Sequence, residues 1–229
     1  MQNQHKVQMQ ILRELLFNPW TRFTDLNIEG LTSDHFTYHI KTLVQKGYIK
    51  CLSGKYLLTA SGKEFANTMD TDRLKVEKQA KVGVLVIAFR REKDKSYILI
   101  QTRLKEPYFG FRGFITGKVR FGETVSEAAS RELFEETGLG VNFVHRCIVH
   151  EHVYSKQNDK LLEDKFFHVF QAIDLEGKLI DTTAGKNEWI READFPDVTP
   201  KFYDEDDLLR WCKRPQRRFV EKKYYVETF

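Results

Sequence analysis

The sequence is poor in cysteine and has no long apolar run, and these absences exclude several classes of protein. Its 229 residues include three cysteines, Cys51, Cys147 and Cys212, which lie far apart and form no C-x-x-C pair. This spacing supports neither a zinc site nor a disulfide framework. The first ten residues lack the apolar core of a signal peptide, and no stretch approaches transmembrane length. We therefore expect a soluble cytoplasmic protein without a membrane partner.

Neither sign of charge is in large excess, because the formal net charge is only +4. Residues 1–78 carry 11 basic against 8 acidic side chains, so most of the excess lies near the N-terminus. This imbalance weakly favours a nucleic-acid partner for that part of the chain. A hydrophobic content of 41% supports an ordinary core, and the length allows one large domain or two small ones.

Three glutamates are spaced to share one face of a helix. Glu132, Glu135 and Glu136 follow one another at i, i+3 and i+4. Like charges this close repel, and a fold tolerates them most readily around a cation. Carboxylate oxygens suit a hard ion, so the spacing predicts Mg²⁺ or Mn²⁺ rather than zinc. An acidic solvated helix is the alternative.

The limits of this helix are marked in the sequence. Thr124 and Glu127 form a T-x-x-E capping box, and Gly138 is a typical C-terminal stop. Gly117 and Gly122 allow a tight loop that returns the chain to the acidic face. An apolar stripe with a spacing of four residues predicts the buried face of the helix: Val125, Ala129 and Leu133.

The whole stretch matches the Nudix box, G-x5-E-x7-R-E-U-x-E-E-x-G-U, where U is a bulky aliphatic residue. The fixed positions are filled by Gly117, Glu123, Arg131, Glu132, Leu133, Glu135, Glu136, Gly138 and Leu139. The chain therefore resembles the Nudix hydrolases over about residues 80–213. One departure is Ile115-Thr116 where many members carry Pro-Gly before the box glycine.

The resemblance implies hydrolysis of a diphosphate bond in a nucleoside diphosphate derivative. Glu132, Glu135 and Glu136 would hold Mg²⁺ or Mn²⁺, and Glu132 is the first choice to orient or deprotonate the attacking water. Arg131 would position the carboxylates, Glu123 would support the metal site, and backbone amides around Gly117 would contact phosphate. A further acidic ligand often comes from a later loop, for which there are four candidates: Glu151, Glu163, Asp181 and Glu188.

The fold implied by the resemblance is an α/β/α sandwich with a mixed sheet. We expect strands near residues 82–89, 97–102, 144–154, 166–173 and 188–190, and a final helix over 204–212. Aromatic side chains that could form a slot for the base are Tyr108, Phe109, Phe111, Tyr154 and Phe167. A tyrosine at about the distance of Tyr154 beyond the box resembles a feature of dinucleoside-polyphosphate hydrolases. No proline occurs in that region, which disfavours the ADP-ribose subgroup.

The pattern of residues 1–70 predicts a separate small domain. We expect three helices before a hairpin. The first is amphipathic and ends near Asn18, the second is short and lies within 23–28, and the third spans 33–47 and is capped by Ser33. The hairpin strands lie at 48–50 and 55–59, and a helix over 61–69 closes the domain. This order resembles the winged helix-turn-helix of small prokaryotic transcription regulators.

The third helix of such a domain would enter the major groove of double-stranded DNA. The expected contacts are His35, Tyr38 and Lys41 on that helix and Lys55 on a short wing. A dimerisation or protein-docking role is the alternative, and we expect a homodimer. His35 and His39 are spaced as a metal pair, but no third ligand is evident, so we expect them to pack or to form hydrogen bonds.

Two segments complete the expected organisation. Residues 71–79 are predicted to be a linker or a helix extension, and residues 214–229 a basic tail that is solvated or holds phosphates. Two functions are then possible for the chain as a whole. It is an active Nudix pyrophosphohydrolase carrying a winged helix, or a transcription regulator whose Nudix domain senses a nucleotide metabolite. The intact acidic set favours the first.

Overall fold

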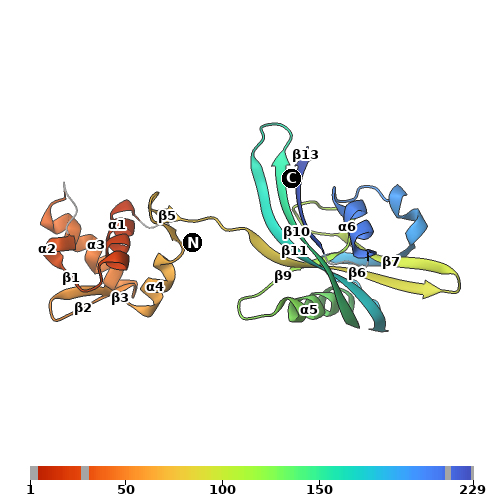
Figure 1. The fold of residues 1–229 in the computed structure, drawn as a ribbon, viewed down its shortest axis with the longest axis horizontal. Coiled ribbons are helices and arrows are strands. Elements are labelled where there is room, and N and C mark those ends of the chain that lie inside the picture. Colours follow the sequence, from red (N-terminus) through yellow and green to blue (C-terminus); the bar gives the residue numbers. More distant parts are fainter. Residues whose placement is uncertain (1–4, 27–30, 215–217, 228–229) are drawn as a thin grey trace. The chain divides into compact units, whose positions relative to one another are not determined.

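The computed structural model describes residues 5–26, 31–214 and 218–227. The chain divides into two compact units, Met1–Lys78 and Gln79–Phe229 (Figure 1). The first unit has one hydrophobic core, and the second has two, which contain different residues. Each unit therefore buries its own apolar side chains.

Helices in the N-terminal unit pack around a common core that includes Leu12, Phe36 and Leu43. They lie within a few residues of the predicted positions. One detail differs from expectation: Thr32, not Ser33, caps the third helix, and its hydroxyl accepts from the His35 backbone N–H. The helices are α1 (Lys6–Phe17), α2 (Phe23–Leu26), α3 (Ser33–Gln45) and α4 (Ala60–Ala66).

A three-stranded antiparallel sheet completes this unit, in the order β1-β3-β2. The predicted hairpin turns at Ser53-Gly54, whose φ angles of 50° and 73° fit the tight turns that match strand twist. The additional two-residue strand was not predicted. The strands are β1 (Thr21–Arg22), β2 (Ile49–Leu52) and β3 (Lys55–Leu58). The assignment as a winged helix-turn-helix stays a prediction.

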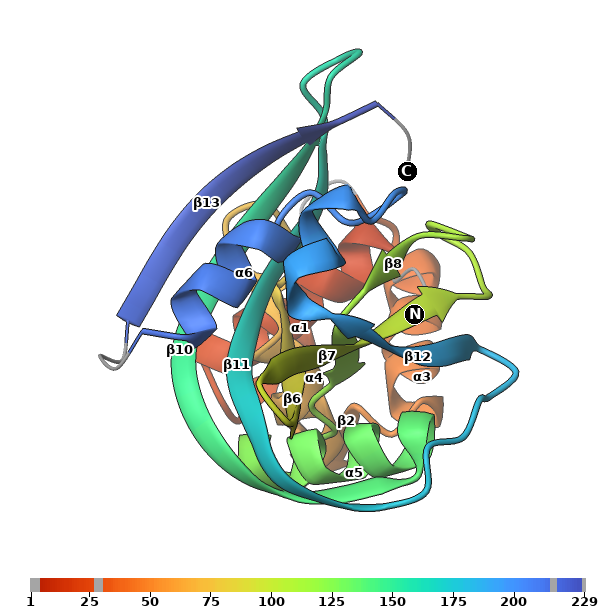
Figure 2. The ribbon, with the colours of Figure 1, turned by 90° about the vertical axis from the view of Figure 1, so that its right-hand side faces the viewer.

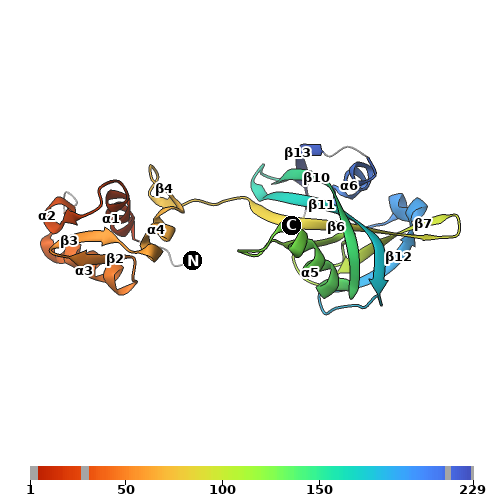
Figure 3. The same cartoon turned by 60° about the horizontal axis from the view of Figure 1, so that its bottom comes forward.

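The interval expected to be a linker or a helix extension instead contains the turn and second strand of a small hairpin that begins at Met69. β4 (Met69–Asp70), labelled in Figure 3, pairs antiparallel with β5 (Lys75–Val76). Asp70 accepts hydrogen bonds from the backbone of the turn. Met69 is buried in the N-terminal core, and Val76 packs against it. These two apolar anchors attach the segment to the first unit.

The second unit is built on an eight-stranded mixed sheet. Its main path runs β12-β7-β6-β11-β10-β13, with β8 paired to β7 and β9 paired to β6. β6 with β11 and β10 with β13 are parallel, and the other pairs are antiparallel. The strands are β6 (Lys81–Glu92), β7 (Lys95–Arg103), β8 (Arg112–Gly113), β9 (Ile115–Lys118), β10 (Leu139–Ser155), β11 (Leu161–Gly177), β12 (Gly185–Arg191) and β13 (Arg218–Val226).

Alternation along β6 separates the two cores of this unit. Val84 and Val86 face the helix α5 (Val125–Thr137), whereas Leu85 and Ile87 face the helix α6 (Glu205–Cys212). A short 3₁₀ helix, η1 (Glu192–Asp197), precedes α6. Figure 2 shows α5 and α6 with the sheet between them. The predicted α/β/α arrangement with a mixed sheet is therefore confirmed for this unit.

The C-terminal segment differs from the expected basic tail. Arg218–Val226 forms β13, which pairs in parallel with β10 from Cys147 to Ser155 (Figure 3). The long outer edge of β10 offers unpaired backbone groups, which this strand satisfies. Its basic side chains obscured the strand pattern in the sequence. Among the residues that the structure describes, no helix combines the length and apolar character needed to cross a membrane.

Candidate active site

The helix α5 presents the acidic face predicted from the sequence. The Thr124 hydroxyl accepts from the Glu127 backbone N–H, and Glu127 accepts from the Thr124 backbone N–H at 2.8 Å, which completes the capping box. Gly138 ends the helix in the left-handed conformation, with φ of 73°. Leu133 is buried against the sheet, which leaves the carboxylates on another face.

Arg131 holds three glutamates together. Its guanidinium donates to both carboxylate oxygens of Glu123, at 2.6 Å and 2.9 Å. It also donates to Glu132 at 2.7 Å, to Glu135 at 3.2 Å and to the Lys118 carbonyl at 3.0 Å. The bidentate pair with Glu123 fixes the plane of the guanidinium. One side chain therefore joins the loop before α5 to the acidic face of the helix.

The charges of this cluster stabilise one another. The hydrogen bonds from Arg131, together with that from the Arg120 backbone, lower the pKa of Glu123 from 4.5 to about 2. Hydrogen bonds to Glu123 raise the pKa of Arg131 above its ordinary value. Glu123 thus stays ionised through the physiological range and anchors the arginine.

Gly117 on β9 is in direct contact with Glu132. A β-carbon at position 117 would lie 1.9 Å from the Cδ atom of Glu132, a distance that no side chain tolerates. The absence of a side chain therefore creates the space that Glu132 occupies. The departure at Ile115-Thr116 leaves this contact in place, because Ile115 is buried within the core under α5.

Glu136 is positioned by side chains that sequence analysis missed. Gln101 Nε2 on β7 and the Thr182 hydroxyl each donate to Oε2 of Glu136 at 3.2 Å. Asn187 accepts from the same Gln101 amide and donates to the Glu136 carbonyl. These partners lie 35 to 51 positions from Glu136. No local spacing in the sequence could have shown them.

The donor set fits a hard divalent ion. Glu132, Glu135 and Glu136 offer carboxylate oxygens only, which suits Mg²⁺ or Mn²⁺. Glu135 is the most accessible of the cluster, with a side chain 47% exposed, and Arg120 lies 3.3 Å from it. Two arginines beside these acids offset their mutual repulsion in the structure.

The candidates for a further acidic ligand are engaged elsewhere. Glu188 pairs with Arg112 at 2.6 Å, and Asp181 accepts from the Asn187 backbone. Glu163 lies 3.0 Å from the Lys165 ammonium. Glu151 is fully buried and lies 3.6 Å from the same lysine. Burial, with Asp204 nearby, raises its pKa well above the usual range.

The expected base slot is divided between two faces of the sheet. Phe111 contacts Tyr108 and Phe202, while Phe109 is 61% exposed. Tyr154 stacks on Tyr225 at 5.5 Å. Phe202, which also contacts Tyr108, lies beside Glu205 of α6 at Gly113. On β10, Val149 packs in the core that contains α6, and Tyr154 is an odd number of positions from Val149, so it lies on the opposite face. The structure therefore does not join Tyr154 with Phe111.

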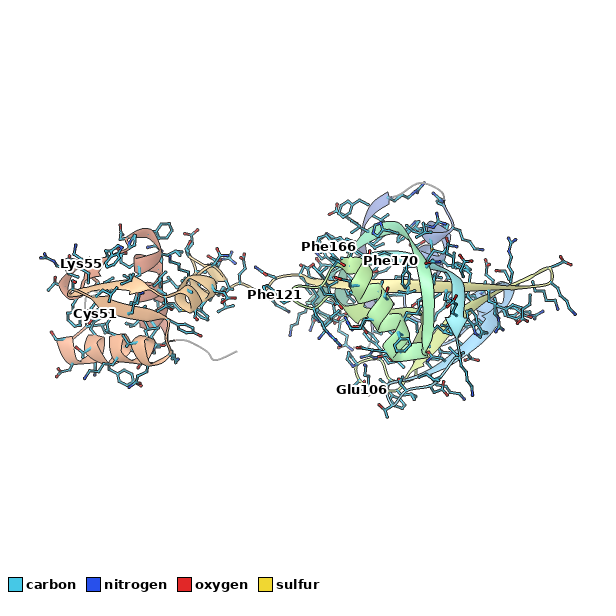
Figure 4. The ribbon with its side chains drawn as sticks, turned by 90° about the horizontal axis from the view of Figure 1, so that it is seen from below. Cys51, Lys55, Glu106, Phe121, Phe166 and Phe170 are labelled. Atoms are coloured by element: carbon cyan, nitrogen blue, oxygen red, sulfur yellow. The ribbon has the colours of Figure 1, made fainter. Side chains whose placement is uncertain are left out.

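The expected DNA contacts are accessible in the N-terminal unit. His35, Tyr38 and Lys41 on α3 are exposed, with Tyr38 at 65%, and Lys55 is exposed at the β2–β3 hairpin (Figure 4). His39 is buried and stacks on His5 with ring centroids 4.6 Å apart. His39 thus packs into the unit rather than facing outward beside His35.

Residues 79–218, more than half of the chain, match the family model described as the NUDIX domain. The chain belongs to the Nudix family. It is a Nudix pyrophosphohydrolase, a hydrolase of nucleotide derivatives.

Two curated relatives share the name oxidized purine nucleoside triphosphate hydrolase. The mouse (Mus musculus) protein is 30% identical over 121 residues, which span 43% of this chain and 74% of the relative. The zebrafish (Danio rerio) protein is 34% identical over 73 residues, which span 32% of this chain and 44% of the relative. The likeness to the mouse protein covers more than two thirds of that protein's length.

Solved structures share the fold at lower identity. The NUDIX domain of Shewanella oneidensis NrtR, solved with ADP ribose, aligns with a TM-score of 0.53 and 16% identity. The alignment covers 68% of this chain and 97% of that domain. A MutT protein from Bacillus halodurans aligns with a TM-score of 0.53 and 20% identity, over 65% of this chain and 93% of that one.

Proposed function

We propose that the acidic face of α5 is the catalytic centre of a divalent-metal-dependent hydrolase of nucleoside diphosphate derivatives. The observation that carries the proposal is the arrangement around Arg131, which gathers Glu123, Glu132 and Glu135 beside Gly117. Carboxylates held in fixed positions by an arginine are suited to bind metal and orient a water near a polyanionic substrate.

The metal-binding residues would be Glu132, Glu135 and Glu136, and the ion would be Mg²⁺ or Mn²⁺. Such an ion, when bound, neutralises phosphate charge and lowers the pKa of water. Glu132 orients or deprotonates the attacking water. Arg131 keeps Glu132 in position, and Glu123 keeps Arg131 charged and oriented. Gln101 and Thr182 fix the carboxylate of Glu136.

The names of the relatives guide the choice of substrates. The mouse relative's name makes oxidised purine nucleoside triphosphates the first compounds to test. ADP-ribose, dinucleoside polyphosphates and nucleotide sugars extend the panel to other diphosphates. Phosphate or nucleotide release is measured with Mg²⁺ or Mn²⁺.

Glu136→Gln keeps the side-chain length but removes the charge, so we expect turnover of the preferred substrate to disappear. Glu176→Gln, at an exposed position near the end of β11, is the matched control and should retain activity. If several compounds bind while none is hydrolysed, the catalytic proposal is wrong and the domain acts as a sensor.

A second function is favoured by the exposed face of α3. We propose that the N-terminal unit is a winged helix-turn-helix that binds double-stranded DNA through His35, Tyr38, Lys41 and Lys55. The exposure of Tyr38 and Lys41 on one helix supports this. A nucleotide bound by the Nudix unit would then bias DNA affinity, as coupling between two sites allows. The alternative role of this unit is to form a homodimer.

Fluorescence anisotropy with labelled duplex DNA at several salt concentrations tests this function. We expect affinity to fall steeply with salt, and Lys41→Glu to weaken binding. Lys63→Glu, exposed on α4, is the matched control for charge. Sedimentation of the same samples reports the oligomeric state. A dimer whose DNA affinity is unaffected by Lys41→Glu would favour the dimerisation role.

A further inference from the structure

A cluster of metal-binding side chain types lies on the sheet, apart from the glutamates of α5. His150 and His152 are two positions apart on β10, so they project from the same face, and Asp164 on β11 lies directly across from His152. One ligand atom from each lies within 4.8 Å of the others. His150 Nε2 and His152 Nε2 are 3.0 Å and 3.5 Å from the same Asp164 oxygen.

The surroundings of His150 orient one of its nitrogens toward this cluster. Its Nδ1 lies 3.4 Å from the Glu221 carboxylate on β13, which leaves Nε2 directed at Asp164. Phe166 stacks on the imidazole with ring centroids 3.9 Å apart and planes 10° from parallel. A carboxylate on the second nitrogen of a ligating histidine is the usual outer support of a zinc site.

We propose that His150, His152 and Asp164 bind Zn²⁺, with Glu221 as the outer partner of His150. Two imidazole nitrogens and one carboxylate oxygen are a zinc donor set, and water completes a tetrahedral ion with three protein ligands. The side chains of the three ligands are 17%, 29% and 35% exposed, so an ion can enter from solvent. The bound ion would join β10 to β11, and through Glu221 would also fix β13.

The mixed donor set distinguishes this site from the acidic face of α5. Oxygen-only ligands favour Mg²⁺, whereas imidazole favours zinc and its neighbours in the first transition series. Zinc should therefore bind to the full-length chain in the presence of excess Mg²⁺. The spacing of the cysteines could not predict this site, because its ligands are histidine and aspartate side chains that two paired strands bring together.

Co²⁺ provides a spectroscopic probe of this site in the full chain. With Mg²⁺ in excess, we expect an intense visible spectrum of the tetrahedral type, which Zn²⁺ displaces. His152→Ala and Asp164→Asn should each abolish it, and Glu221→Gln should weaken binding by roughly 10- to 100-fold. His168→Gln, which removes a contact to His145 elsewhere on the sheet, is the matched control and should keep the spectrum.

Circular dichroism and nucleotide hydrolysis establish that each variant is folded, independently of metal binding at this site. A weak octahedral spectrum, or a tetrahedral one that survives in folded His152→Ala and Asp164→Asn, would overturn the proposal. In that case the three side chains form only a network of ion pairs between strands.

Discussion

At the scale of single residues, Gly117 has no room for a side chain because Glu132 already lies there. Gly117→Ala should displace Glu132, which the β-carbon would approach to 1.9 Å from Cδ. A shift of about 1 Å at the carboxylate proposed to act on the attacking water costs on the order of 100-fold in kcat/KM. Steady-state kinetics with the preferred substrate measures the effect.

Gly140→Ala is the matched control for this change. A β-carbon at position 140 meets no atom within 4 Å, so activity and melting temperature should both be preserved. If Gly117→Ala were as active as the parent protein, the contact with Glu132 would have no part in catalysis.

Glu123 makes stability depend on pH. Its pKa falls from 4.5 to about 2 in the folded chain, so the unfolded state binds the proton more readily. The stabilisation is therefore complete above about pH 4.5 and disappears as the pH falls toward about 2. Glu123→Gln should lower the melting temperature near neutral pH, and the difference should close in acid. A difference that stayed constant with pH would contradict the assigned ion pair.

At the scale of elements, the capping box stabilises the start of α5. Thr124→Ala removes the hydroxyl that accepts from Glu127 N–H and donates to the Glu127 carboxylate at 2.7 Å. We expect a loss of about 1 kcal/mol in the free energy of unfolding, measured by urea denaturation. Ser126→Ala, exposed in the first turn, should change stability little. An equal loss in both variants would argue against the cap.

The elements differ in how far the sequence predicts them. α5 was predictable to its ends, because its cap, apolar stripe and glycine stop lie within one short stretch. β13 was not, because its strand character depends on pairing with β10, about 70 residues earlier. The partners of Glu136 were hidden for the same reason, since Gln101 and Thr182 meet it only through the fold.

The sequence also could not predict every side chain that faces inward. Alternation along β10 puts Glu151 on the buried face between Val149 and Val153, yet a charged residue is expected on the surface. Burial became possible because Lys165 on β11 lies opposite. The sequence thus predicted the acidic face of α5, but it did not predict the polar partners that long-range strand pairing supplies.

At the scale of the whole molecule, separate cores predict separable activities. A fragment of residues 79–229 contains the sheet, both covering helices and every residue of the proposed catalytic centre. We expect it to fold alone and to hydrolyse the preferred substrate with the kcat/KM of the full chain. An inactive but folded fragment would show that residues 1–78 contribute to catalysis.

Because α5 has an apolar face and an acidic face, it restricts where residues can be inserted or deleted. Each added residue turns the rest of a helix by about 100°, so one insertion after Ala129 would rotate Leu133 away from the sheet and move acidic side chains toward the core. The loop before Thr124 has no such periodic constraint, and Phe121 within it is fully exposed (Figure 4). Selection should therefore eliminate insertions and deletions within the helix, and should tolerate those in the loop only where Glu123 still reaches Arg131.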